Sequence, residues 1–174
     1  MKPYLISSEH GMDLYFFRHG AAMPAPPGGS DAGRILTEEG RKAVCVGGKG
    51  LLRIGVNPDR ILTSPLLRAR ETATLLAESL DSGGETELVN SLLPDADPRG
   101  FLAELARSSS RRILCVGHLP FLPRCISFCI SGTTSLPFEM EPASSAHVAF
   151  EGGPRPGAGV LVWVLPPPLL RALA

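Results

Sequence analysis

The chain lacks the features that mark several large classes of protein. Its 17 lysine and arginine residues are balanced by 17 aspartate and glutamate residues, so it has no excess of positive charge. A general nucleic-acid-binding protein would show such an excess or a basic stripe. No apolar run approaches the roughly 20 residues that a helix needs to span a bilayer, and no basic segment followed by an apolar one opens the chain. We therefore expect neither a nucleic-acid nor a membrane partner.

Cysteine is scarce, and its spacing excludes further classes. No two cysteines form a CxxC pair, and none is followed six positions later by the arginine of a cysteine-nucleophile phosphatase site. The chain also has no HExxH motif and no paired histidines at metal-ligand spacing, so we expect no metal site and no cofactor. Without a secretory signal pattern, reduced thiols and a cytosolic location are expected. The four residues concerned are Cys45, Cys115, Cys125 and Cys129.

Strand and helix patterns alternate along the chain. Short continuous apolar runs over Leu14–Phe17 and Ile113–Val116 are typical of strands covered on both faces. Arg60–Thr63 is predicted as a further strand. Such alternation favours a mostly parallel sheet with helices on its faces. The predicted helices cover residues 38–53, 65–80, 101–106 and 119–130.

The C-terminal part has a different pattern. Ala146–Phe150 and Gly159–Val164 flank a loop rich in glycine and proline and predict an antiparallel hairpin. The predicted fold is therefore α/β: a three-layer α/β/α sandwich with a mostly parallel central sheet and this hairpin at its C-terminal end. A chain of 174 residues is expected to form a single domain. We assign that domain to residues 12–174 and expect residues 1–11 to be a poorly ordered extension.

Two local features can be predicted around the first helix. Thr37 is expected to cap it, with the apolar residues Val44, Leu51 and Leu52 facing inward. The preceding loop Ala22–Gly33 is unusually long for a compact domain and is a candidate functional loop. We expect this loop to be mobile, because nothing in it has an evident anchor in a core.

Polar residues follow three of the predicted strands at the point where each strand ends. They are Arg18 and His19, Arg68 in the first turn of the next helix, and His118. Because the carboxyl ends of parallel strands share one edge of a sheet, and ligands bind along it, these side chains are expected to converge. Two guanidinium groups match a phosphoryl group bidentately, and a neutral imidazole can attack phosphorus and carry the phosphoryl group covalently.

Helix N-termini predicted at Ser64-Pro65 and near Leu119 would add anion-binding N–H groups to this edge. Taken singly, each polar residue has an ordinary explanation: a chance tripeptide at a strand end, a solvated arginine, a histidine that caps a helix. Their occurrence together at three strand ends favours a phosphoryl site.

Four segments together resemble a known family. FFRHG, LTEEG, ILTSPLLRARETA and ILCVGHLP are similar to motifs of the histidine phosphatase superfamily, also called phosphoglycerate-mutase-like. The short length and the motif order resemble its SixA-type phosphohistidine phosphatase branch, over about residues 12–170. The resemblance implies that His19 is the nucleophile and that Arg18, Arg68 and His118 bind the phosphoryl group. It also implies that Arg34 lines the substrate entrance.

An acidic residue of the family pattern is not clearly matched. Many members carry one between the second arginine and the second histidine, where it protonates the leaving oxygen. The nearest candidates are Asp95, a possible proton donor, and Asp97, and both are also explained as turn residues beside Pro94 and Pro98. An alkoxide leaving group needs such a donor, whereas the nitrogen of phosphohistidine leaves more readily once protonated from solvent.

The sequence therefore predicts a metal-independent phosphatase that acts through a phosphohistidine intermediate on His19, with phosphohistidine on a signalling protein as its substrate. For attack, His19 must be neutral, with its proton held on the other ring nitrogen by a backbone carbonyl near Gly20. Two alternatives remain open. One is a small-molecule phosphomonoesterase of the same fold, and the other is a catalytically inactive phosphoprotein-binding module.

Overall fold

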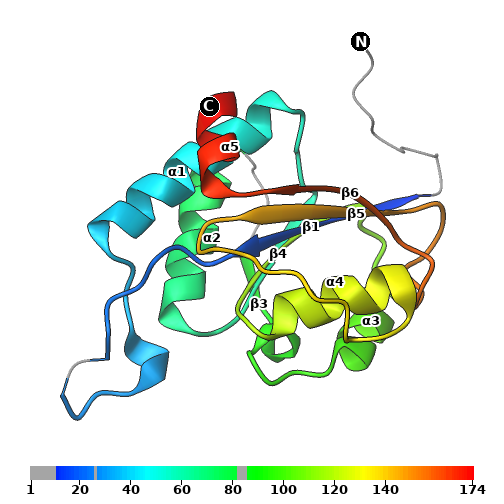
Figure 1. Ribbon diagram of the computed structural model, residues 1–174, viewed down its shortest axis with the longest axis horizontal. Helices are drawn as coiled ribbons and strands as arrows, with labels where there is room; N and C mark the ends of the chain where they lie inside the picture. The colour runs from blue at the N-terminus through cyan, green and yellow to red at the C-terminus, as the bar shows by residue number, and fades with distance from the viewer. Residues whose placement is uncertain (1–10, 26, 82–85) are drawn as a thin grey trace.

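A computed structural model describes residues 11–25, 27–81 and 86–174, so the extension expected over residues 1–11 lies almost wholly outside the described residues. The centre of the molecule is a six-stranded sheet with the strand order β3-β2-β4-β1-β5-β6 (Figure 1). Strands β1 to β4 pair in parallel, and β5 and β6 add an antiparallel hairpin, as predicted. The strands are β1 Met12–Arg18, β2 Arg60–Thr63, β3 Thr86–Leu88, β4 Arg112–Gly117, β5 Ser145–Phe150 and β6 Val160–Leu165.

Helices cover both faces of the sheet, which confirms the predicted three layers (Figure 1). One face carries α1, α2 and α5, and the other carries α3 and α4. Two apolar clusters fill the space between the layers. Among the described residues, no helix combines the length and the apolarity needed to cross a bilayer. The helices are α1 Glu38–Arg53, α2 Leu67–Ser79, α3 Pro98–Leu105, α4 Phe121–Ser131 and α5 Pro167–Leu173.

The apolar run of β1 is continuous because both of its faces are buried. Successive side chains of a strand point to opposite faces of the sheet. Leu14 and Phe16 join the cluster beneath α3 and α4, whereas Tyr15 and Phe17 join the cluster beneath α1 and α2. All four side chains are at most 1% exposed. A polar side chain at any position of this run would therefore be buried.

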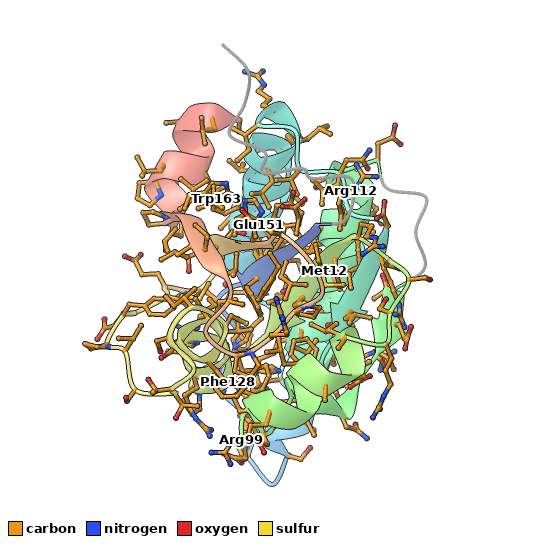
Figure 2. All side chains as sticks on the ribbon, turned by 90° about the vertical axis from the view of Figure 1, so that its right-hand side faces the viewer. Met12, Arg99, Arg112, Phe128, Glu151 and Trp163 are labelled. Carbon is orange, nitrogen blue, oxygen red and sulfur yellow. The ribbon has the colours of Figure 1, made fainter. Side chains whose placement is uncertain are left out.

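The parallel register brings the ends of β1 and β4 together. Arg18 lies opposite Gly117, and the N–H of His19 donates to the carbonyl oxygen of Gly117 at 3.1 Å. β2 pairs in parallel with β4 and ends at the same edge. Figure 2 faces the other edge of the sheet, where the labelled Met12 and Arg112 begin β1 and β4. The predicted convergence at the carboxyl ends of the strands therefore occurs.

The prediction for α1 is confirmed except at one residue. The side chain of Thr37 accepts the N–H of Gly40 at 2.9 Å and caps the helix. Val44 and Leu51 are fully buried, as predicted, but Leu52 is 44% exposed. Each helical residue is turned by about 100° from the one before it. Because Leu51 points into the core, Leu52 is directed toward solvent.

The start of α2 lies later than predicted. The helix begins at Leu67, and Ser64 does not cap it. Instead, the hydroxyl of Ser64 accepts the N–H of Leu66 at 3.3 Å in a turn that precedes the helix. This turn accommodates Pro65, so the helix starts two residues beyond it. Arg68 nevertheless lies in the first turn of α2, as the sequence predicted.

The glycine of the LTEEG segment allows a close approach of two segments. A β-carbon at Gly40 would lie 2.2 Å from the carbonyl oxygen of Ala21. That carbonyl also accepts the N–H of Thr37 at 2.9 Å. The first turn of α1 is therefore in direct contact with the chain just after His19, and the absence of a side chain makes this contact possible.

We expect Gly40→Ala to lower the free energy of unfolding by roughly 1–3 kcal/mol, because the new methyl group displaces either α1 or Ala21. Gly100→Ala, within α3, is the matched control, since a β-carbon there meets no atom within 4 Å. That variant should gain about 0.5–1 kcal/mol from its higher helix propensity. Urea denaturation measures both changes, and equal effects in the two variants would contradict the close contact at Gly40.

Candidate active site

His19 follows the last residue of β1 and has a defined tautomer. Its Nδ1 lies 2.7 Å from the carbonyl oxygen of Gly20. A carbonyl oxygen only accepts, so Nδ1 carries the proton and donates it. This contact confirms the prediction that a backbone carbonyl near Gly20 sets the tautomer. Nε2 of His19 therefore keeps its lone pair and is the nitrogen that can attack an electrophile.

Thr72 fixes the segment that follows His19. Its hydroxyl accepts the N–H of Gly20 at 3.2 Å and donates to the carbonyl oxygen of Arg68 at 2.7 Å. The threonine is fully buried, so water does not compete for either bond. The carbonyl that sets the tautomer of His19 is thereby tied to the helix that carries Arg68.

Arg68 brings a positive charge to the attacking side of His19. Its side chain is 5% exposed, and its Nε lies 3.4 Å from Nε2 of His19. The two terminal nitrogens bind Asp31: Nη1 donates to the main-chain oxygen at 2.9 Å, and Nη2 donates to the carboxylate at 3.0 Å. The guanidinium group is therefore held between a loop residue and the imidazole.

His118 follows β4 and lies against His19. The ring centroids are 4.9 Å apart. The His118 side chain is 1% exposed, and neither of its ring nitrogens has a hydrogen-bond partner among the described residues. Buried polar atoms are nearly always paired in folded proteins. Both nitrogens are therefore available to a ligand, and the side chain does not cap α4.

Arg18 lies beside the same pair but is held differently. Its Nη1 donates to the carbonyl oxygen of Met140 at 2.6 Å, and its Nε is buried without a partner in the described part of the chain. Arg18 also lines a cavity of about 480 Å³ whose other walls include Leu119 and the segment 134–142. Arg18 therefore borders this cavity, and its charge also helps to lower the pKa values of both histidines.

Asp31 is the site residue that the sequence analysis missed. Its carboxylate binds Arg68 and also accepts from Nη1 of Arg34 at 3.1 Å, while Nε of Arg34 donates to the carbonyl oxygen of Met23 at 2.7 Å. Asp31 links Arg34 to Arg68, and the charge of Arg34 also helps to lower the pKa of His19. These contacts correct the expectation that the loop Ala22–Gly33 has no anchor. The carboxylate of Asp31, in this loop, accepts a hydrogen bond from the buried Arg68, 37 positions away. The only sequence signal was an acid three residues before an arginine.

Burial and neighbouring cations keep both histidines uncharged. Burial lowers the pKa of His19 to about 4; the hydrogen bond to Gly20 opposes this shift, and the charge of Arg68 adds to it. Burial also lowers the pKa of His118 to about 3, with smaller contributions from His19 and Arg68. At neutral pH the site therefore combines two neutral imidazoles with arginine cations. Such a site suits an anionic electrophile that a nitrogen lone pair attacks.

Comparison with known proteins agrees with this chemistry. Residues 14–92 match a family model described as histidine phosphatase superfamily (branch 1). An uncharacterized protein of Picosynechococcus is 38% identical over 114 residues, which cover 64% of this chain and 68% of that protein. The chain belongs to the histidine phosphatase superfamily. The resemblance carried by its sequence motifs is therefore confirmed.

Within this superfamily the similarity extends to the SixA-type branch. Phosphohistidine phosphatase SixA of Escherichia coli is 26% identical over 159 residues, which cover 90% of this chain and 94% of SixA. A structure of the protein histidine phosphatase SixA complexed with tungstate superposes with a TM-score of 0.80 at 25% identity, covering 90% of this chain and 97% of that one. Each of these two matches covers 90% of this chain.

Among the described residues, neither candidate acid of this histidine phosphatase family member makes a hydrogen bond or ion pair with the histidine pair. Asp97 caps α3, and its carboxylate accepts the N–H of Arg99 at 3.0 Å. It therefore has the local structural role that the flanking proline suggested. Asp95 is exposed in the preceding turn. Within the described residues, Asp95 makes no hydrogen bond or ion pair with His19 or His118.

We expect nuclear magnetic resonance titration to find both site histidines neutral at pH 6. Because burial lowers their pKa values, the neutral forms should persist as the pH falls, and His19 should protonate only near pH 4. The ring signals of His19 and His118, assigned with His19→Gln and His118→Gln variants, measure this. A protonation midpoint of His19 near the ordinary value of about 6.5 would contradict the electrostatics of the site.

Proposed function

We propose that this protein is a phosphatase that removes the phosphoryl group from phosphohistidine on a protein, through a covalent phosphohistidine intermediate on His19. The observation that carries the proposal is the fixed tautomer of His19. Its Nε2 lone pair is directed at a buried arginine, where a phosphoryl group would be held by charge. Arg18, Arg68 and His118 are proposed to bind that group, and Arg34 is proposed to line the entrance.

The reaction needs two displacements at phosphorus. In the first, Nε2 of His19 forms a bond to phosphorus while the bond to the substrate nitrogen breaks, and that nitrogen takes a proton from water. In the second, a water molecule attacks phosphorus and the bond to Nε2 breaks, with the electron pair returning to Nε2. One proton of this water neutralises the hydroxide left by the first step, and the other leaves with the released hydrogen phosphate. Arg68, the unpaired Nε of Arg18 and the one N–H of neutral His118 stabilise the oxygens in both steps, as preorganised donors do. No metal ion enters either step.

The acidity of nearby carboxyl groups supports a phosphoramidate substrate. Asp31 is the carboxylate that contacts the site, and its pKa is lowered, chiefly by its hydrogen bond from Arg34, so it carries no proton at neutral pH. Asp95 is exposed and makes no contact with the histidine pair in the described structure. An alkoxide leaving group needs a positioned acid. The nitrogen of phosphohistidine takes its proton from solvent and needs none.

Among the alternatives, a small-molecule phosphomonoesterase of the same fold would use the same His19 chemistry and differ in its leaving group. A catalytically inactive phosphoprotein-binding module would not need an imidazole with a fixed tautomer and a lone pair facing an arginine. A phosphorylated protein of a signalling pathway is therefore the proposed partner. The proposed compartment is the cytosol, where the four free thiols would stay reduced.

A brief reaction with ³²P-labelled substrate, quenched in alkali, should leave the label on His19. Phosphohistidine survives base and not acid, so the label should be lost on acid treatment. His19→Ala should abolish both the label and turnover. Arg68→Ala should keep the fold and lower kcat/KM. The decrease should correspond to a loss of about 2–4 kcal/mol of transition-state stabilisation, as for lost oxyanion donors. Near-native turnover by His19→Ala would show that another group is the nucleophile.

The cavity beside Arg18 is proposed to receive the part of the substrate that carries the phosphoryl group. Leu136 lines this cavity and is 42% exposed. Leu136→Ala should raise KM for a phosphohistidine peptide roughly three- to tenfold, because apolar contact area is lost, and should leave inorganic tungstate binding unchanged. Leu88→Ala is the matched control, since Leu88 is 52% exposed on β3. Equal effects of the two variants would exclude the cavity as the leaving-group site.

A further inference from the structure

Asp31 makes an unusual two-point contact with Arg68. The main-chain oxygen and the carboxylate of this single residue each accept one hydrogen bond, from the two terminal nitrogens of the guanidinium group. The Asp31 side chain is 60% exposed, whereas the Arg68 side chain is 5% exposed. A residue near the surface therefore determines the orientation of a buried cation beside the proposed nucleophile.

The geometry of a guanidinium group shows what this contact leaves free. The group carries five N–H bonds in one plane, two on each terminal nitrogen and one on Nε. Asp31 takes one bond from Nη1 and one from Nη2, at the end of the side chain. The edge formed by Nε and the second N–H of Nη2 is not used by Asp31 and faces His19, where Nε donates a long hydrogen bond to Nε2 at 3.4 Å. That edge can bind two phosphoryl oxygens bidentately.

We propose that Asp31 is a positioning residue, which holds the guanidinium group of Arg68 so that its Nε edge faces the phosphoryl group during transfer to His19. The inference rests on the proposed function, because it assigns Arg68 to the phosphoryl group. Arg34 completes the arrangement: it binds the other carboxylate oxygen of Asp31 and the carbonyl oxygen of Met23. Asp31 is thereby fixed between one arginine that it orients and one that holds it.

Two other roles for Asp31 are less consistent with these contacts. A proton donor would have to carry a proton, yet the hydrogen bond from Arg34 lowers the pKa of Asp31. A carboxylate that merely occupied the phosphoryl position would bind Nε and Nη2, on the edge that faces His19. Asp31 instead binds Nη1 and Nη2. The positioning role accounts for both terminal contacts and for an Nε edge that faces His19.

The test compares Asp31→Ala with Asp31→Asn, using p-nitrophenyl phosphate as substrate and tungstate as binding probe. Asparagine keeps an oxygen that accepts from Nη2, whereas alanine removes it. Asp31→Ala should lower kcat roughly 10- to 100-fold, the loss expected when a charge-assisted contact that orients a reacting group is removed. KM should change less than about threefold, because the charge of Arg68 remains. Asp31→Asn should restore kcat to within about fivefold of the unmodified protein.

Glu87→Gln is the matched control, because it breaks an arginine–carboxylate pair with Arg60 at the β3 end of the sheet. It should leave kcat unchanged. Equal losses in Asp31→Asn and Asp31→Ala would overturn the inference, since charge rather than orientation would then be responsible. Tighter tungstate binding together with unchanged or higher kcat in Asp31→Ala would also overturn it, because Asp31 would then be a competitor for the phosphoryl position.

The test is separate from the test of the proposed function. The aryl phosphate reports on His19 and Arg68 whatever the natural leaving group is. If the unmodified protein hydrolyses p-nitrophenyl phosphate but not a phosphohistidine peptide, the proposed substrate is wrong, and the comparison of Asp31 variants still decides the role of Asp31. If both substrates are hydrolysed and Asp31→Ala is as active as the unmodified protein, the positioning role alone is wrong.

Discussion

β1 and β4 lie side by side in parallel register, with Arg18 opposite Gly117 at the point where both strands end. His19 and His118 directly follow the two strands, so the register places these residues side by side, and their ring centroids are 4.9 Å apart. A slip of one residue would turn every side chain of β1 to the other face of the sheet. Two apolar clusters, one on each face, oppose such a slip. Core packing and site geometry are therefore set by the same pairing.

Burial gives the site its chemistry and also has a cost. Removing the histidines from water favours their neutral forms, which leaves a lone pair on His19 at neutral pH. The same burial leaves ring nitrogens of His118 and Nε of Arg18 without partners among the described residues. Each such atom costs free energy comparable to a lost hydrogen bond. A bound oxyanion would accept from Nε of Arg18 and from the one N–H of neutral His118, so binding would relieve part of this cost.

The three layers, the convergence of His19, Arg68 and His118, and every strand except β3 could be predicted because each has a local signal. The three residues of β3 are exposed and form no apolar run, so this strand was missed. Continuous apolar runs indicate buried strands, and the residue after a strand end has a known place in a parallel sheet. The start of α2 was misplaced because Ser64-Pro65 is compatible with a helix cap and with a turn. Leu52 was assigned to the core because apolar character alone does not show which side of a helix faces inward. Its neighbour Leu51 occupies the inward position instead.

The sequence by itself determined the fold class, the superfamily and the edge of the sheet at which the polar residues meet, because these depend on short-range patterns and on motifs. Only the tertiary structure decided how the arginines are held. Arg68 is oriented by Asp31, 37 positions away, and Arg18 is held by Met140, 122 positions away. Hydrogen bonds between such distant residues leave no periodic pattern along the chain. They depend on where loops lie after the sheet and its helices have packed, and that placement is a property of the whole fold.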